Sequence, residues 1–299
     1  MLHSPVSASA KRARLRARLA QGPILALPGA FNPLSAMLIE RHGFEGVYLS
    51  GAVLAADLGL PDIGLTTLSE VAARSAQVAR VTGVATIVDA DTGFGEPMNV
   101  ARTVQMLEDA GVASMHLEDQ VNPKRCGHLD GKQVVERDEA LRRINAATAS
   151  RRDANFLVIA RTDARAVEGL DGAIERARAY VDAGADAIFP EALLDEREFA
   201  AMRAAVTVPI LANMTEFGKG PSLSVAQLGE LGVDMVIFPV SLLRLAMGAA
   251  DRALDLLTRE GTLTTMLGEM QTRAELYDLL DYGSFAAFDQ SVFDFTVGP

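Results

Sequence analysis

The sequence predicts an α/β fold, a (β/α)8 barrel of the TIM type. Eight short apolar runs rich in β-branched residues recur along the chain without alternating polar residues, which is typical of parallel strands buried on both faces. Helical patterns separate the runs, and each repeat spans roughly 30 residues, the size of one βα unit. A doubly wound sheet is the alternative, but residues 28–33, directly after the first run, lack its glycine-rich phosphate-binding pattern.

The predicted strands follow one another without a change in composition: Ile24–Leu27, Gly46–Leu49, Ala85–Val88, Ala113–Leu117, Phe156–Ala160, Ala187–Phe189, Ile210–Ala212 and Met235–Phe238. The helices predicted between them are Leu68–Val81, Val100–Ala110, Arg137–Ala149, Gly172–Ala183, Glu196–Ala205 and Ser224–Leu231. Thr67 and Glu70 form a capping box at the start of the first helix. Three other helices are followed by the glycine expected at a helix end, Gly111, Gly184 and Gly232. Since no linker interrupts the repeat, we expect one domain over residues 1–299.

The two ends of the chain differ in character. Residues 1–21 carry five basic residues and no acid, with Leu15 and Leu19 one turn apart, so they predict a basic N-terminal helix or arm; an organelle transit peptide is the alternative. Residues 262–299 predict a C-terminal helical extension with four phenylalanines close together, Phe285, Phe288, Phe293 and Phe295. Aromatic side chains beyond a completed barrel need a covering surface, either their own barrel or a partner chain.

Composition limits the partners and the compartment. The formal charge of −11 disfavours binding to nucleic acid or to an anionic membrane. No apolar stretch has the length of a transmembrane helix. Cys126 is the only cysteine, which excludes an intrachain disulfide and suits a reducing compartment such as the cytoplasm.

Polar residues follow nearly every predicted strand. In a barrel the carboxyl ends of the strands form one rim, where the active sites of this fold are built. So many charged endings on one rim favour an enzyme over a purely structural barrel. The residues concerned are Ser50, Gly51, Asp89, Asp91, Glu118, Asp119, Arg161, Thr162, Asp163, Glu191, Asn213, Thr215, Ser241 and Arg244.

Asp89 and Asp91 are the candidate metal ligands. They stand two apart at a strand end, so their side chains point the same way, and two like charges held together require a cation or a proton between them. Glu118 ends the next strand and adds a third carboxylate. Oxygen ligands without a nearby Cys/His pair suit Mg²⁺. The alternative is that the aspartates cap a helix or pair with arginines of the barrel.

The longest loop, residues 120–132, contains Cys126. Most lone cysteines are buried apolar residues, but this one stands among Lys124, Arg125 and His128 in a polar segment. Neighbouring cations favour the thiolate, so we interpret Cys126 as functional and the loop as a candidate lid. A solvated surface loop is the alternative, since a Lys-Arg pair is usually exposed.

Three arginines are candidate clamps for a small anion: Arg161, Arg244 and Arg273. A guanidinium binds a carboxylate through two parallel hydrogen bonds. Arg273 has a competing interpretation, because Thr272 and Glu275 form a capping box and Arg273 then merely begins a helix.

Six strings carry a resemblance to a known family: Tyr48–Gly51, Asp89–Gly95, His116–Gln120, Lys124–His128, Ala160–Ala164 and Asn213–Gly218. Over about residues 28–277 the chain resembles the 2-methylisocitrate lyase branch of the isocitrate lyase / phosphoenolpyruvate mutase superfamily. The Lys-Arg-Cys-Gly-His string marks the lyase branch rather than the mutases. The resemblance implies a barrel that uses Mg²⁺, or Mn²⁺ in its place, to cleave 2-methylisocitrate to pyruvate and succinate in the methylcitrate cycle of propionate catabolism. It also implies a homotetramer whose C-terminal helices are exchanged between subunits.

The matching motifs imply a role for each site residue. Asp89 and Asp91 would hold the metal, with Glu118 close by, and Cys126 would be the general acid. Candidates for handling the hydroxyl proton of the substrate are Tyr48, His116 and Glu118. The implied contacts to the carboxylates of a di- or tricarboxylate substrate come from Ser50, Gly51, Ala52, Gly127, His128, Arg161, Glu191, Asn213, Thr215, Arg244 and Arg273. Ala52 departs from the family, in which many members have glycine.

The substrate is less narrowly defined than the reaction. One methyl group distinguishes 2-methylisocitrate from isocitrate and is worth only about 1–3 kcal/mol in an apolar pocket. The chain has no Trp, whereas isocitrate lyases of the superfamily carry Trp near the sixth strand, and here Phe189 is the candidate wall of a methyl pocket. Isocitrate or 2,3-dimethylmalate lyase, oxaloacetate hydrolase and phosphonate mutase are the alternatives, as is a metabolite-binding barrel without turnover.

Overall fold

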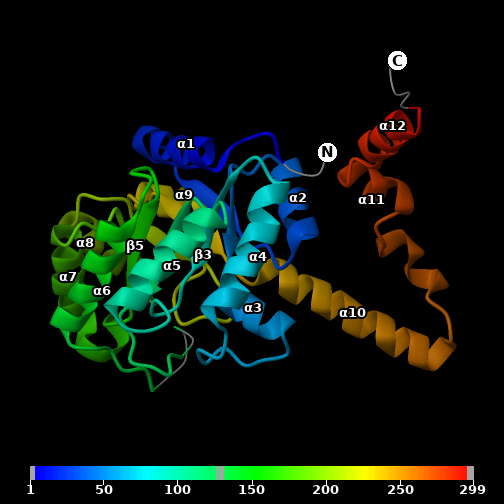
Figure 1. Cartoon of the computed structure of the whole chain (residues 1–299). Helices are drawn as coiled ribbons and strands as arrows, with labels where there is room; N and C mark the ends of the chain where they lie inside the picture. Colours follow the sequence, from blue (N-terminus) through cyan, green and yellow to red (C-terminus); the bar gives the residue numbers. More distant parts are fainter. Residues whose placement is uncertain (1–3, 126, 128–130, 295–299) are drawn as a thin grey trace, which may run out of the picture.

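The computed structural model describes residues 4–125, 127 and 131–294. Two predicted site residues, Cys126 and His128, lie outside the described residues. Most of the chain forms a barrel of parallel strands surrounded by helices, and a set of C-terminal helices extends away from it (Figure 1).

Eight parallel strands close the barrel, as predicted. Their bounds are β1 Leu25–Pro28, β2 Gly46–Leu49, β3 Ala85–Asp89, β4 Ser114–Glu118, β5 Leu157–Thr162, β6 Ala187–Pro190, β7 Leu211–Asn213 and β8 Met235–Phe238. Hydrogen bonds run from β2 through β6 in order, and β1 pairs with β8, which pairs with β7. Bridges between Gly29 and Tyr48 and between Ile188 and Ile210 join the two sets, so the strand order follows the chain.

The surrounding helices are α2 Pro33–Arg41, α3 Gly51–Asp57, α4 Leu68–Val81, α5 Pro97–Asp109, α6 Arg137–Ser150, α7 Arg165–Asp182, α8 Glu196–Ala205 and α9 Val225–Glu230. The capping box predicted at Thr67 begins α4. Glycines with positive φ, Gly111, Gly184 and Gly232, follow α5, α7 and α9. Two helices were not predicted, α2 and α3, and α7 begins earlier than predicted because it continues across a break at Gly169.

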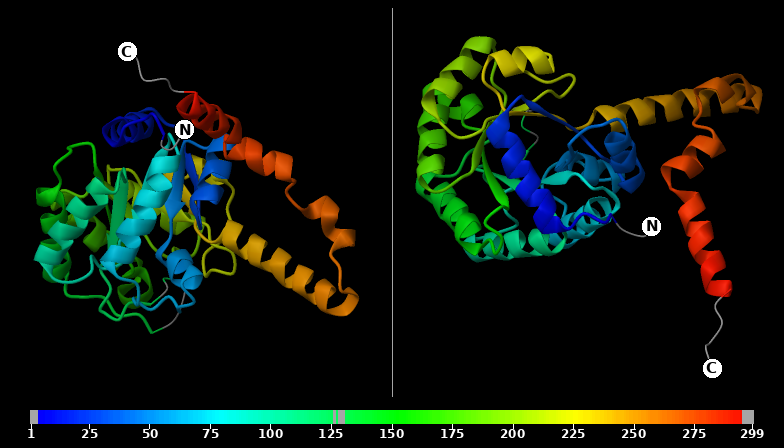
Figure 2. Two further views of the ribbon diagram at one scale, coloured as in Figure 1. Left: turned by 45° about the vertical axis from the view of Figure 1, so that its right-hand side comes forward. Right: turned by 90° about the horizontal axis from the view of Figure 1, so that it is seen from above.

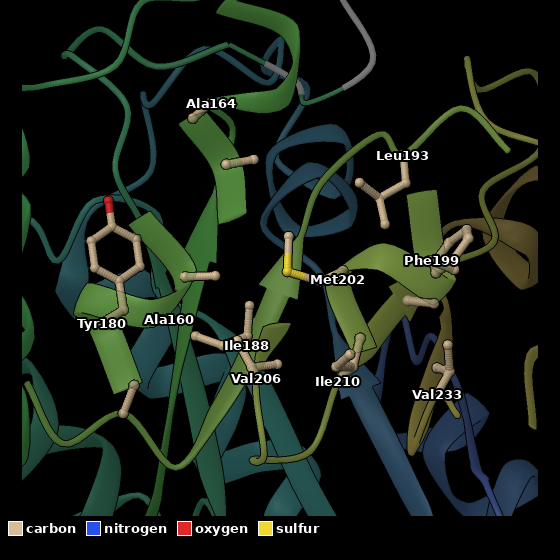
Figure 3. Packing of buried hydrophobic residues seen from close by; sticks show 14 of the residues in the cluster. Ala160, Ala164, Tyr180, Ile188, Leu193, Phe199, Met202, Val206, Ile210 and Val233 are labelled. Atoms are coloured by element: carbon tan, nitrogen blue, oxygen red, sulfur yellow. The ribbon is translucent and has the colours of Figure 1, made fainter. Parts of the chain in front are cut away.

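The core has an inner and an outer part. Inside the barrel, alternate strand residues pack against one another, Ile87 and Ile159 among them. Between strands and helices, Ile188 and Ile210 from the strand side meet Phe199 and Met202 of α8 (Figure 3). This packing fixes which face of each strand points inward, and so fixes the side chains that reach the rim.

Helix α1, Ala8–Gln21, lies across the amino-terminal opening of the barrel (Figure 2). Leu15 is buried and belongs to the inner core, with Leu19 packed beside it. The predicted N-terminal helix is therefore confirmed for residues 8–21, and its buried Lys11 and Arg12 bind main-chain carbonyl groups.

The C-terminal arm, residues 241–294, contains α10 Ser241–Glu260, the 3₁₀ helix η1 Thr264–Glu269, α11 Arg273–Leu279 and α12 Tyr282–Phe293. It begins at Ser241 rather than at the predicted residue 262, because α10 extends away from the barrel without a buried residue (Figure 1). Within the described residues, no helix combines the length and apolarity that crossing a membrane requires.

Candidate active site

Strand geometry explains how the polar residues converge. Side chains alternate across a strand, so a residue two positions after an inner-core residue also points inward. Asp89 follows Ile87 in this way on β3, and Arg161 follows Ile159 on β5. The inward residues at the carboxyl ends of the strands therefore meet at one end of the barrel, which is the rim predicted from the sequence.

Most predicted site residues line one cavity of about 270 Å³ at this rim. The predicted residues in its wall are Tyr48, Ser50, Ala52, Asp89, Gly127, Arg161, Phe189, Glu191, Asn213, Thr215 and Arg244. Gly51 lies just behind the wall and donates its N–H to Asp89 Oδ2 at 3.2 Å. The cavity has the place and the polarity of a binding site for a small anion.

Arg161 is the central charged group of the site. It is buried and lies within ion-pair distance of three carboxylates, Glu118 at 3.1 Å, Asp163 at 2.9 Å and Glu191 at 3.4 Å. Its guanidinium also stacks on Phe189, 5.2 Å from the ring centroid. Asp163 accepts hydrogen bonds from two nitrogens of the Arg161 guanidinium, which fixes the plane of that group. Arg161 therefore presents a fixed cation to the cavity.

Tyr48 and His116 form a buried pair beside Arg161. The Tyr48 hydroxyl lies 2.7 Å from His116 Nε2, and the two rings are stacked. Phe189 meets the imidazole edge-on at 5.3 Å between ring centroids. Burial lowers the pKa of His116 to about 4, and burial together with the charge of Asp89 raises the pKa of Tyr48. At neutral pH, His116 is uncharged and Tyr48 keeps its proton.

Asp89 and Asp91 converge as predicted. A Cβ built on Gly51 would lie 3.0 Å from Asp89 Oδ2 and 3.3 Å from Asp91 Oδ1, so both carboxylates reach the same glycine. Burial would raise the pKa of Asp89, but the basic groups that face it lower this pKa to about 2. Burial and the negative charge of Asp89 raise the pKa of Asp91 to about 6. The pair therefore favours a bound cation.

Lys124 is buried whereas Arg125 is exposed, so the alternative of a solvated Lys-Arg pair is wrong for Lys124. Its Nζ lies 2.7 Å from Asp91 Oδ1 and 2.5 Å from Asp62 Oδ1. Burial would lower the pKa of Lys124, but the surrounding carboxylates raise it above its ordinary value. One cation beside the aspartates is thus supplied by the loop itself, and the predicted lid region contributes directly to the site.

The carboxylates fit Mg²⁺ as a partial ligand set. Asp89 and Asp91 offer buried oxygen atoms, and neither oxygen of the buried Glu118 has a hydrogen-bond partner in the described part of the chain. Among the described residues, no group of three His, Cys, Asp or Glu side chains is arranged as a complete metal cage. Mg²⁺ suits such a site, because it is held by one or two carboxylates and keeps several water ligands.

Two predicted arginine clamps have different positions. Arg244, the first-turn residue of α10 at the cavity wall, donates to Thr215 Oγ1 at 3.2 Å and pairs with Glu216 at 2.9 Å. Arg273 is exposed as the first residue of α11, between the capping-box residues Thr272 and Glu275, and is not in the cavity wall. Within this chain, Arg273 has the helix-start position that was its alternative interpretation.

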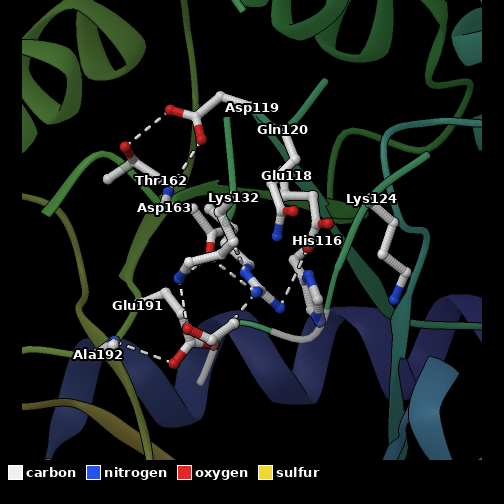
Figure 4. A network of polar contacts seen from close by, with 12 residues as sticks. His116, Glu118, Asp119, Gln120, Lys124, Lys132, Thr162, Asp163, Glu191 and Ala192 are labelled. Carbon is white, nitrogen blue, oxygen red and sulfur yellow. Dashed lines mark hydrogen bonds and ion pairs between the residues drawn. The ribbon is translucent and has the colours of Figure 1, made fainter. Parts of the chain in front are cut away.

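Sequence reasoning missed two connections of the site. Asp62 binds Lys124, and Asp163 connects Arg161 to Lys132, whose Nζ lies 2.9 Å from Asp163 Oδ1 (Figure 4). Asp163 was among the predicted rim residues, and its contact with Arg161 follows because it stands two residues later on the same face of the strand, but its contact with Lys132 was not predicted. Asp62 gives no local signal, since its partner is distant in the chain.

Comparison with known proteins assigns the fold and site to a family. The phosphoenolpyruvate phosphomutase family matches residues 15–258. Probable 2-methylisocitrate lyase 2 of Corynebacterium glutamicum is 58% identical over 296 residues, which cover 99% of this chain and 96% of that protein. The structure of 2,3-dimethylmalate lyase has a TM-score of 0.90 at 34% identity, covering 99% of this chain and 100% of that chain. Phosphonopyruvate hydrolase, solved with oxalate and Mg²⁺, has a TM-score of 0.85 at 31% identity and covers 94% and 98% of the two chains.

The chain therefore belongs to the phosphoenolpyruvate phosphomutase family, whose structures include members of the isocitrate lyase superfamily. Relatives named 2-methylisocitrate lyase are 44–58% identical over nearly the whole chain, which confirms the resemblance predicted from the motifs. The protein is accordingly an enzyme, a carbon–carbon lyase.

Proposed function

We propose that the enzyme cleaves 2-methylisocitrate to pyruvate and succinate, as a step of the methylcitrate cycle in propionate catabolism. The observation that carries the proposal is the cavity, whose wall combines the fixed cation of Arg161 with the carboxylate of Asp89. Asp91 lies behind this wall and converges with Asp89 on Gly51. The names of the relatives support the substrate. A barrel that binds metabolites without turnover would not need this concentration of buried charge beside an open cavity.

The reaction requires a base, an acid and stabilisation of an enolate. The hydroxyl of the substrate loses its proton, the carbon–carbon bond breaks, and its electron pair passes to the carbon that becomes part of succinate. Arg161 and Ser50 would hold the carboxylate of the pyruvate half. Mg²⁺, or Mn²⁺, held by Asp89 and Asp91 would supply a Lewis acid for the substrate oxygen that loses its proton and becomes the carbonyl oxygen of pyruvate.

The Tyr48–His116 pair is the proposed route for the hydroxyl proton. Because His116 is neutral and hydrogen-bonded to Tyr48, it can take the Tyr48 proton while Tyr48 accepts that of the substrate. The alternative, Glu118, does not line the cavity, whereas Tyr48 does, and burial raises the pKa of Glu118 well above the usual range. We assign Cys126, which lies outside the described residues, as the acid that protonates the succinate carbon, because its loop places the neighbouring Gly127 in the cavity wall.

Phe189 is the proposed wall of a methyl pocket. Its side chain is buried, lines the cavity, and is held between His116 and Arg161. A rigid aromatic wall suits an extra methyl group on the substrate, whereas an exposed polar wall would not. Glu191, Asn213, Thr215 and Arg244 would hold the carboxylates of the succinate half, with Gly127 and His128 from the loop.

We also propose a homotetramer that exchanges its C-terminal helices. The arm exposes large apolar side chains, among them Leu245, Leu254, Phe288 and Phe293, and such a surface needs a partner. Light scattering at micromolar concentration should give four times the chain mass, and a monomer would reject the proposal. No nucleic acid or membrane partner is proposed, because the chain carries a net charge of −11, and the single cysteine favours the cytoplasm.

The assignment of the acid is tested by Cys126→Ser. Because the serine hydroxyl is a far weaker acid than the thiol, we expect kcat to fall at least about 10²-fold with pyruvate and succinate still bound. Titration calorimetry with the two products measures the binding. Near-full turnover of the variant would contradict the assignment.

A further inference from the structure

Residues 119–135 form a loop whose two ends are joined. Gln120 and Val134 form an antiparallel bridge directly after β4. The Val121 N–H donates to the Gln133 carbonyl at 2.9 Å, and the Val135 N–H donates to the Asp119 carbonyl at 2.8 Å. Residues near this base are therefore fixed to the barrel, whatever the conformation of the loop beyond it.

Two side chains on the fixed base reach into the loop. The Gln120 carboxamide accepts from the Arg125 N–H and donates to the Arg125 carbonyl, each at 2.9 Å. The Lys132 ammonium donates to the Gly127 carbonyl. Both side chains are buried, and each forms hydrogen bonds with main-chain groups of the loop. The main chain is thus held on either side of position 126.

Lys132 also joins the loop to the site. Its Nζ lies 2.9 Å from Asp163 Oδ1, and the same carboxylate orients the guanidinium of Arg161 (Figure 4). Asp163 is fully buried, and its own N–H donates to Asp119 Oδ1 at 2.9 Å. One carboxylate therefore sets the positions of both the substrate-facing arginine and the loop lysine.

Gly127 lies where a small displacement would matter. A Cβ at this position would come within 2.5 Å of Arg161 Nη2 and of Glu191 Cγ, so the main chain rests directly on the two cavity residues. A buried ammonium is costly unless it is paired, and the partners of Lys132 among the described residues are Asp163 and the carbonyl groups of the loop, that of Gly127 in particular. The bond to Gly127 therefore also stabilises the lysine.

We propose that Lys132, together with Gln120, is a positioning residue that holds the loop main chain at Arg125 and Gly127 against Arg161. Neither side chain lines the cavity, so each acts through the residues that it holds. The role in catalysis rests on the proposed lyase function. The clamp itself is a structural property and can be measured without substrate.

Trypsin measures the clamp directly, because Arg125 is exposed and Lys124 is buried. We expect Lys132→Met and Gln120→Leu to increase the rate of cleavage after Arg125 at least tenfold, since cleavage follows local opening of the segment. Mass spectrometry of the fragments identifies the bond. Lys132→Arg keeps the charge and the donors, and should stay within about threefold of the wild-type rate.

Kinetics with 2-methylisocitrate complete the test. Lys132→Met should lower kcat/KM about 10²-fold, and Lys132→Arg should recover most of the loss. The matched control is Lys11→Met, which removes a buried lysine at the opposite end of the barrel and should lower Tm without altering cleavage after Arg125.

Unchanged cleavage and unchanged kcat/KM in Lys132→Met would overturn the proposal. So would a fall in Tm without a change in cleavage after Arg125, because that result would give Lys132 a purely structural role. If the variants open the loop while the wild-type enzyme fails to turn over 2-methylisocitrate, the clamp stands and the proposed substrate is wrong.

Discussion

The two ends of the barrel bury the same kinds of cation among different partners. At the amino-terminal end, Lys11 donates to the Ala79 and Thr82 carbonyls, and Arg12 donates to the Val112 and Glu108 carbonyls. These carbonyl groups lie at helix and strand ends, and Arg12 also forms an ion pair with one carboxylate, Asp153, at 3.3 Å. The cations of this end therefore fasten α1 to the barrel. Lys11 lines a cavity of about 360 Å³ there, but none of the residues in the wall of that cavity was predicted as a site residue.

At the carboxyl end, each buried cation of the cavity wall lies among several carboxylates. Arg161 faces Glu118, Asp163 and Glu191, and Lys124 faces Asp91. Grouping so many ionisable side chains in a low-dielectric site shifts their pKa values in opposite directions, as Asp89 and Asp91 show. A buried cation therefore does not by itself indicate whether it serves function or stability. The charge and the position of the groups that surround it distinguish the two roles.

Gly127→Ala should have the largest effect at the carboxyl end. The added Cβ would lie 2.5 Å from Arg161 Nη2, so either the loop or the guanidinium must move. We expect kcat/KM to fall at least about 10²-fold, because a displacement of about 1 Å in a site has that cost. Steady-state kinetics measures the change, and thermal unfolding should show Tm nearly unchanged. Wild-type kinetics in this variant would contradict the tight approach of the loop.

Arg12→Met tests the amino-terminal end. It leaves the Val112 and Glu108 carbonyls without their donor and removes the 3.3 Å ion pair with Asp153. The free energy of unfolding should fall by about 3 kcal/mol, while kcat/KM of the folded enzyme stays unchanged. Urea denaturation and kinetics under folding conditions measure the two quantities. A loss of kcat/KM in the folded variant would contradict the claim that the amino-terminal end contributes to stability only.

His116 predicts a pH dependence of stability. Its folded pKa of about 4 lies below the ordinary value of 6.5, so the unfolded chain binds more protons between these values. Stability should therefore decrease as pH falls from 6.5 to 4, by about 3 kcal/mol for this group. In His116→Gln, denaturation curves across this range should show a correspondingly smaller loss. An equal loss in the variant would assign the effect to other groups.

Phe189→Leu should have the smallest effect and sharpen the account of the substrate. A shorter side chain removes the aromatic wall beside Arg161 and His116. The preference in kcat/KM for 2-methylisocitrate over isocitrate should fall about tenfold, within the range that one methyl group allows. Competition between the two substrates measures this ratio directly. An unchanged ratio would mean that Phe189 is barrel core only.

Local patterns predicted most of the fold. The strands β2 and β8 and the helices α4 and α8 have the predicted bounds, because apolar periodicity and capping residues act over short distances. Helix α10 was missed, since none of its residues is buried and its start was taken for a strand end. Sequence periodicity does not say which chain will cover an apolar face.

The sequence predicted which residues at the strand ends form the candidate site, but not the ion pairs that connect them. The side chains of Asp89, Arg161 and Glu191 are expected to point inward because side chains alternate along the strands at whose ends these residues stand. The burial of Lys124 depends on Asp62, which stands 62 residues before it in the chain. Ion pairs between residues so distant in the chain form only in the folded barrel, and a local sequence pattern does not reveal them.

Pyruvate release tests the central claim most directly. The enzyme would be given threo-2-methylisocitrate, isocitrate, 2,3-dimethylmalate and oxaloacetate at equal concentration, with Mg²⁺, with Mn²⁺ and with chelator. The account predicts rapid metal-dependent release of pyruvate from 2-methylisocitrate, with succinate in equal amount and much slower turnover of the other acids. No pyruvate from 2-methylisocitrate, with efficient turnover of another acid, would contradict it.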